Sequence, residues 1–124
     1  MINKTPYLFQ CYAYMLNINS GIIHITDRHG DSVDEIPMSS TAPVTSLEWD
    51  KDGEYLAILQ DGNGVVPLWN LSSKRVAPLE TNLKDPTFLA WSKTGPQLAI
   101  GTAKGELEFF YNGEVLLLSL SIVL

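Results

Sequence analysis

Short apolar runs, each bounded by turn-forming residues, recur along the chain. Apolar or alternating runs occupy residues 44–49, 55–60 and 65–70, and a shorter, more polar run occupies 75–80. The intervening segments, 50–53 and 61–64, contain glycine or asparagine, which tolerate the positive φ of tight turns. This pattern predicts an antiparallel sheet whose inner strands are apolar on both faces and whose outermost strand is more polar.

The same pattern returns 42 residues later, in a second copy that runs from Thr87 to about residue 120. A period of about 40–45 residues with a tryptophan, a turn glycine and an aromatic-plus-polar end indicates a four-stranded propeller blade. The matches at this offset include Trp49 with Trp91, Gly53 with Gly95, Leu56-Ala57-Ile58 with Leu98-Ala99-Ile100, and Trp69-Asn70 with Tyr111-Asn112.

The repeat assigns structural positions rather than catalytic ones, because large residues that recur at one phase suit a blade core better than a stacking platform. The structural repeat positions are Trp49, Gly53, Trp69, Trp91, Gly95 and Tyr111. The residues expected to be buried are Trp49, Leu56, Ile58, Trp69, Trp91, Leu98 and Ile100.

A weaker, earlier copy lies at an offset of 43, where Gly21 matches Gly64 and Val33 matches Val76. It predicts strands at residues 12–16, 22–27 and 32–36. Its first strand is not found, because Pro6 and Gln10 fall where the tryptophan and the turn glycine stand in the later copies.

The 124 residues therefore predict an all-β chain, a partial propeller of about three four-stranded antiparallel blades that is not closed. The expected blades are residues 1–38, which are incomplete, 39–81 and 82–120. Propellers close with about 4–8 blades, so we expect a fragment or alternative product of a longer protein, or a chain that associates to complete a ring.

Residues 115–124 are apolar except for two serines, and we expect them to form an apolar tail or an outer strand. Ten residues cannot span a bilayer, which needs about 20, so no membrane insertion is expected. A strand edge with no charge and no proline is an aggregation hazard.

The net charge of −6 and the pI of about 4.7, with scattered lysines and arginines, disfavour a nucleic-acid surface, which needs a basic patch. The single cysteine, Cys11, cannot form an internal disulfide, and a reducing compartment such as the cytosol is the simplest setting. No convincing signal peptide is present.

Residues 50–53, residues 27–31 and His24 are the polar positions that could support chemistry. Residues 50–53 resemble the start of a calcium loop, but the second copy has Ser92-Lys93-Thr94-Gly95 there and no glutamate follows at the required position. Residues 27–31 gather a histidine and two aspartates but fall at an expected turn, and His24 lies mid-strand. No serine elbow, Cys-x-x-Cys pair or phosphate loop occurs, so we expect no enzyme, no metal and no cofactor.

Trp69-Asn70 and Tyr111-Asn112 stand where a closing Trp-Asp pair stands in the WD-repeat family, which this sequence resembles. Asp27-Arg28-His29-Gly30, residues 47–53, Trp91-Ser92-Lys93 and residues 98–105 make it similar, more narrowly, to the N-terminal propeller of a WD-repeat subunit of intraflagellar transport complex A. The likeness covers roughly residues 20–112.

This resemblance implies a non-catalytic protein-interaction scaffold in retrograde ciliary transport and cilium assembly. The implied partners are other intraflagellar transport complex A subunits and ciliary cargo. The implied location is the cilium, the ciliary base and the cytoplasm.

Three alternatives stay open at this stage. One is a ligand-binding or enzymatic propeller with its site at the central channel, to which the first strands offer Thr45, Glu48 and Thr87 at most. Another is a truncated WD-repeat product with no independent function. The third is a generic WD-repeat scaffold of another complex.

Overall fold

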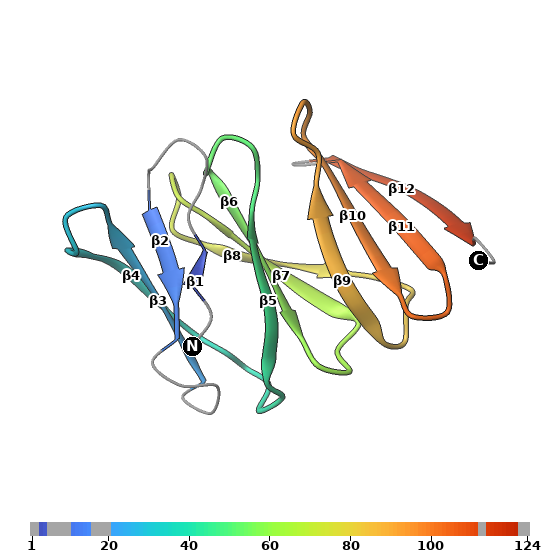
Figure 1. The fold of residues 1–124 in the computed structure, drawn as a ribbon, viewed down its shortest axis with the longest axis horizontal. Coiled ribbons are helices and arrows are strands. Elements are labelled where there is room, and N and C mark those ends of the chain that lie inside the picture. The colour runs from blue at the N-terminus through green and yellow to red at the C-terminus, as the bar shows by residue number, and fades with distance from the viewer. Residues whose placement is uncertain (1–2, 5–10, 16–20, 112–113, 122–124) are drawn as a thin grey trace.

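The computed structural model describes residues 3–4, 11–15, 21–111 and 114–121, whose strands form three antiparallel sheets of four strands each. No described residue is helical, so the predicted all-β class is confirmed. The described ranges accordingly contain no helix long and apolar enough to cross a membrane. Figure 1 shows the sheets side by side in chain order, in an open array that does not close into a ring.

Each sheet is built from four strands that pair in chain order. The first sheet contains β1 (Asn3–Lys4), β2 (Cys11–Tyr14), β3 (Ile22–Asp27) and β4 (Ser32–Pro37). The second contains β5 (Val44–Trp49), β6 (Tyr55–Gln60), β7 (Val65–Asn70) and β8 (Val76–Glu80). The third contains β9 (Pro86–Trp91), β10 (Gln97–Thr102), β11 (Glu106–Tyr111) and β12 (Glu114–Ser121).

The first sheet has the opening strand that the sequence repeat did not reveal. β1 is only two residues long and pairs with β2, with Asn3 opposite Tyr14 and Lys4 opposite Ala13. Its two residues, asparagine and lysine, do not include the tryptophan that ends the first strand of the later copies. At the other end of the chain, β12 begins at Glu114, one residue before the expected outer strand, and residues 122–124 lie outside the described part.

Apolar side chains form two clusters, one between the first and second sheets and one between the second and third. The second sheet contributes alternate residues of β6 to each cluster. Leu56 and Ile58 belong to the first cluster, whereas Ala57 and Leu59 belong to the second. This alternation explains why the run at 55–60 is almost continuously apolar, because both faces of the strand are buried by neighbouring sheets.

A proline shortens the pairing of the second sheet's inner strands. The β6–β7 pairing comprises three residue pairs and stops at Ala57 opposite Leu68, immediately before Pro67. The β10–β11 pairing of the third sheet comprises five pairs and continues through Glu108. Proline cannot donate a ladder hydrogen bond, so the strands separate at Pro67.

The outer strands of the first two sheets offer few free donors along their open edges. The backbone N–H of Met38 points toward the neighbouring strand and donates to the Gly21 carbonyl. Because successive N–H groups along a strand point in alternate directions, positions 37 and 35 face the open edge. Position 37 is a proline and has no N–H, and the Glu35 N–H donates to Asp34 Oδ1 at 2.9 Å. The outer strand of the second sheet, β8, also contains a proline, Pro78. Such edges resist pairing with another chain.

The connection from the first sheet to the second is held by Gln60, at the end of β6. Its buried Nε2 donates to the carbonyl oxygens of Ser40 (3.1 Å) and Ala42 (3.0 Å). Buried side-chain amides need such partners, and here they position the loop along the junction between the two sheets.

Candidate interaction surfaces

Trp69 joins the second sheet to the first. Its side chain is fully buried, and its indole Nε1 donates to Asp34 Oδ2 on β4 at 2.7 Å. The Trp49 and Trp69 rings meet edge to face, with centroids 6.0 Å apart and an interplanar angle of 81°. Two of the three predicted repeat tryptophans therefore lie at the same junction, where Trp69 combines apolar burial with a charge-assisted hydrogen bond.

Trp91 joins the third sheet to the second in a related way. Its indole Nε1 donates to the backbone carbonyl of Glu48 at 2.9 Å. Trp91 packs against the second cluster but is only partly buried, unlike Trp49 and Trp69, so it does not belong to the buried set in which the repeat placed it.

The equivalent of Trp69 in the third sheet is Phe110, not Tyr111. Trp69 lies opposite Leu56, and the repeat equivalent of Leu56, Leu98, lies opposite Phe110. Phe110 is 3% exposed, whereas Tyr111 is 41% exposed and occupies the position of Asn70. The offset falls from 42 to 41 residues because the turn at 103–105 is one residue shorter than the turn at 61–64.

The two glycines assigned to one turn position have different conformations. Gly53 has a φ of 70°, in the left-handed region that favours glycine, and its turn is closed by Asp50 Oδ1, which accepts from the N–H groups of Glu54 and Tyr55. Gly95 is not among the described glycines with positive φ, and its N–H donates to Ser92 Oγ at 3.0 Å. Only the first turn therefore requires glycine for its backbone conformation.

The acidic turn at residues 27–31 is held by its own backbone. Asp27 Oδ1 accepts hydrogen bonds from the N–H groups of His29 (2.8 Å) and Asp31 (3.0 Å). The bond from Asp31, followed by that from His29, holds the pKa of the exposed Asp27 carboxyl below its ordinary value. This arrangement is an Asx-type turn, in which the aspartate serves the backbone.

The candidate His24 and the single cysteine, Cys11, occupy ordinary structural environments. His24 stacks on Tyr14, with ring centroids 5.3 Å apart, and its Nδ1 lies 3.6 Å from Glu35 Oε1. Cys11 is buried in the first cluster, and this burial, with a smaller contribution from Asp27, raises the pKa of its thiol. Within the described part of the chain, no three His, Cys, Asp or Glu side chains are grouped as metal ligands would be.

None of the three residues that the first strands offer to a central channel is fully buried. Thr45 and Thr87 are exposed and Glu48 is half-buried. The Thr45 hydroxyl donates to the Leu59 carbonyl of the adjacent strand at 3.3 Å. This bond stabilises the β5–β6 pair and gives no sign of a ligand site.

The outward face of the third sheet exposes aromatic residues. Phe88 is 42% exposed, and a Cβ added to Gly101 would lie 2.0 Å from Cζ of the Phe88 ring, so the ring packs closely against this glycine. Leu107 and Phe109 on β11 are partly exposed. In the second sheet, the residues equivalent to Leu107 and Phe109 pack against the third sheet, so this face has the chemistry of a sheet-packing surface.

Glu108 is a buried carboxylate that the sequence repeat did not single out. It is fully buried, and both carboxylate oxygens accept from the Asn82 backbone N–H, at 3.0 and 3.1 Å. Asn82 belongs to the connection between the second and third sheets, so Glu108 holds this connection against β11. A charged residue at an inward position of a strand is the signal that could have identified it.

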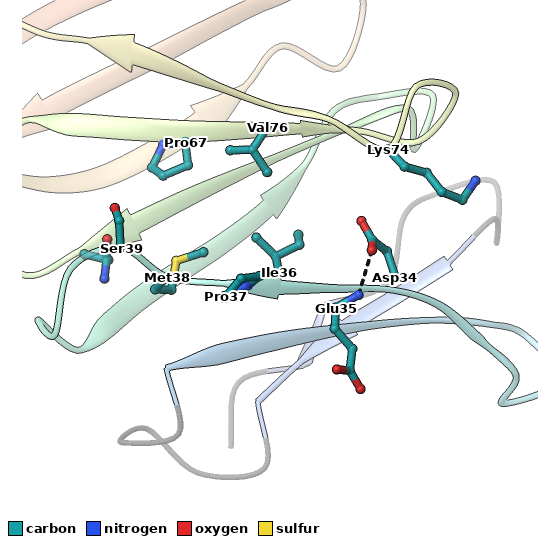
Figure 2. Close-up of a pocket in the computed structure, with 10 residues that line it drawn as sticks. Asp34, Glu35, Ile36, Pro37, Met38, Ser39, Pro67, Lys74 and Val76 are labelled. Carbon is teal, nitrogen blue, oxygen red and sulfur yellow. Dashed lines mark hydrogen bonds between the residues drawn. The ribbon is translucent and has the colours of Figure 1, made fainter.

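A groove of about 420 Å³ lies between β4 and the outer strands of the second sheet. Figure 2 shows Asp34 and Ile36 projecting from β4 toward Pro67 and Val76, while Glu35 projects to the opposite side. The remaining lining residues are Pro37, Met38, Ser39, Gln60 and Lys74.

The family model described as the WDR19 first beta-propeller matches residues 10–116 of this chain. WD repeat-containing protein 19 of Homo sapiens is 37% identical over 92 residues, which cover 73% of this chain and 7% of that protein. WD repeat-containing protein dyf-2 of Caenorhabditis elegans is 33% identical over 93 residues, which cover 72% of this chain and 6% of that protein. The chain thus spans less than a tenth of the length of these relatives.

Solved WD-repeat structures share the fold at low sequence identity. The structure of U3-55K aligns with a TM-score of 0.76 and 16% identity, over 95% of this chain and 38% of that one. The crystal structure of Hsv2 from Kluyveromyces marxianus aligns with a TM-score of 0.72 and 20% identity, over 88% of this chain and 34% of that one. These similarities establish the architecture alone.

Proposed function

Because the chain belongs to the family of the first β-propeller of WDR19, we propose that it is a non-catalytic protein-interaction scaffold of intraflagellar transport complex A. The role that we assign to it is in retrograde ciliary transport and cilium assembly. The observation that carries the proposal is the match of one family model across residues 10–116, which include the greater part of all three sheets.

The proposed partners are other complex A subunits and ciliary cargo proteins, and the proposed location is the cilium, the ciliary base and the cytoplasm. The arrangement of the sheets supports a scaffold. Two buried clusters fix the three sheets relative to one another, and the turns and outer strands between them present polar and apolar side chains to solvent. Protein binding at such loops and rims requires no bound cofactor.

We further propose that residues 1–38, 39–81 and 82–120 act as three blades of one propeller. The repeat positions that support this division are Trp49, Gly53, Trp69 and Trp91, with Phe110 in place of Tyr111. The two indole N–H bonds that cross the junctions, from Trp69 and Trp91, support it independently.

Affinity purification from ciliated cells tests the proposal. The tagged 124-residue chain should enrich complex A subunits and should concentrate at the ciliary base. A matched variant, Leu56→Asp, places a charge in the first cluster and should lose both properties, because an unpaired charge in a core unfolds a domain of ordinary stability.

Two results would contradict the proposal. If the chain enriched a different complex, it would be a scaffold of that complex. If the chain enriched nothing beyond the Leu56→Asp variant, it would have no independent function of this kind.

A further inference from the structure

The groove beside β4 lies at the first junction between sheets, and a charged contact occupies the equivalent strand position at the second junction. The residue equivalent to Pro67 is Glu108, since Ala57 lies opposite Leu68 and its equivalent, Ala99, lies opposite Phe109. At the second junction, Glu108 binds the N–H of Asn82 and is fully buried. At the first junction, the Pro67 side chain has no acceptor with which to bind the connecting loop, and Pro67 lines the groove instead.

Aliphatic side chains form one part of the groove's lining. Ile36 forms the buried part, and Met38 and Pro67 are partly exposed beside it. Val76 is 43% exposed, one of the few large apolar side chains of the described part that are exposed to this degree. A volume of about 420 Å³ falls within the range of roughly 300–1,000 Å³ that is typical of sites for small ligands, and it can accept an aliphatic side chain.

One end of the groove is acidic. The Asp34 carboxylate accepts from Trp69 Nε1 and from the Glu35 N–H, which leaves about two of its four acceptor positions open. No lysine or arginine of the described ranges lies within ion-pair distance of this carboxylate. The Lys74 ammonium donates to the Leu71 carbonyl at 3.4 Å, and Figure 2 shows its side chain extending away from Asp34.

The edge of β4 disfavours the addition of a partner strand. Position 37 has no N–H, and the outward N–H of Glu35 is occupied by Asp34. A partner therefore gains little from main-chain pairing here and must be recognised through its side chains. Asp34 and Ile36 are two residues apart on β4, so side chains two residues apart in an extended partner have the matching separation of about 7 Å.

We propose that this groove binds an extended protein segment that places an aliphatic side chain between Ile36 and Val76 and a basic side chain two residues away against Asp34. The net charge of −6 of the chain favours approach of such a basic segment. The inference rests on the proposed protein-binding role and adds to it the chemistry of one partner segment.

Fluorescence anisotropy of the full chain with short labelled peptides tests this site. The probe is fluorescein-Gly-Ser-Leu-Ser-Arg-Ser-Gly-amide, in which leucine and arginine are two residues apart. Peptides with serine in place of leucine, or with glutamate in place of arginine, should each bind at least about tenfold more weakly, as removal of an anchor residue does at other interfaces.

Matched protein variants locate the binding. Val76→Lys should weaken the probe about tenfold, whereas Ala77→Lys, which introduces the same side chain on the opposite face of β8, should leave the affinity unchanged. Asp34→Asn retains an oxygen acceptor for Trp69 but removes the charge. It should weaken the leucine-arginine probe and leave a leucine-glutamine peptide unaffected, and thermal unfolding of each variant verifies that it is folded.

The site is overturned if the probe does not bind at millimolar concentration, or if Val76→Lys and Ala77→Lys have equal effects. It is also overturned if Asp34→Asn weakens both peptides equally. Enrichment of complex A subunits by a chain that fails to bind the probe would overturn the groove while leaving the proposed function intact. Probe binding by a chain that does not enrich complex A subunits would overturn the proposed function while leaving the groove as a binding site.

Discussion

The indole Nε1 of Trp69 donates a 2.7 Å hydrogen bond to Oδ2 of Asp34, a residue 35 positions earlier and in the preceding sheet. The donor is fully buried and the acceptor is a carboxylate, which makes the bond stronger than a neutral one. This bond fixes how the first two sheets meet at their outer side.

Asp34→Ala should destabilise the chain by about 1–3 kcal/mol, because the buried indole N–H would lose its partner. Asp34→Asn should cost less, since the amide oxygen can still accept. Urea unfolding followed by tryptophan fluorescence measures both. Glu35→Ala, at the adjacent and exposed residue, is the control and should change the free energy of unfolding little. Equal losses for Asp34→Ala and Glu35→Ala would disprove this role of the bond.

Phe110→Ala should destabilise the chain by about 3–5 kcal/mol, as truncation of a buried phenylalanine does. Tyr111→Ala should cost only about 1 kcal/mol, since its side chain is 41% exposed. Denaturant midpoints compare the two. If Tyr111→Ala were the more damaging change, the repeat would keep its 42-residue offset through β11 and the assignment of Phe110 would be wrong.

Gly53→Ala should destabilise by about 1–2 kcal/mol, because alanine is strained at a φ of 70°. Gly95→Ala should be neutral or should stabilise by up to about 1 kcal/mol, because an added Cβ meets nothing closer than Ser92 Oγ at 3.9 Å. Thermal melting of the two variants provides the comparison. A Gly95→Ala variant as unstable as Gly53→Ala would contradict the difference between the turns.

The Asp27 carboxyl should titrate below the ordinary aspartate pKa of about 3.9. A lowered pKa in the folded state means that the ionised form stabilises the fold above the unfolded pKa. This contribution is lost as the pH falls through the folded pKa. Carboxyl chemical shifts from NMR report the pKa directly. As the pH falls below about 4, the Asp27→Asn variant should lose less free energy of unfolding than the parent chain. An Asp27 midpoint at or above about 3.9 would refute the expectation.

Phe88→Asp should reduce self-association of the purified chain. The Phe88 ring lies on the outward face of the third sheet, and burial of such apolar area drives association at about 25 cal/mol per Å². Thr87→Asp adds the same charge at the neighbouring exposed residue and should have less effect. Size-exclusion chromatography with light scattering gives the masses. A parent chain that stays monomeric at high concentration would remove the basis of this prediction.

The sequence repeat predicted the architecture well because it records local chemistry. Strand positions, turn positions and the double-sided burial of residues 55–60 all follow from the spacing of apolar and turn-forming residues. The 42-residue offset gave the wrong equivalent for Trp69, Tyr111 instead of Phe110. The turn at 103–105 is one residue shorter, which shifts every later match by one position. The chance identity of Asn70 and Asn112 concealed this shift.

The junction chemistry could not be predicted in the same way. The contact between Trp69 and Asp34 depends on how two sheets pack, which no periodicity within either repeat encodes. The equivalence of Pro67, which lines the groove, with Glu108, which binds the connecting loop, becomes visible only when the strands are aligned by pairing register. Comparison of equivalent positions between sheets is therefore where the structure adds most.

The central position of the second sheet has a consequence for the motions of the chain. Both faces of β6 are buried, whereas each flanking sheet has only one face against a cluster. Amide hydrogens of β6 should therefore exchange most slowly with solvent, and protection should decline outward toward either terminus. Local opening would begin in the flanking sheets, and the middle of the molecule would hold its hydrogen bonds until the whole chain unfolds.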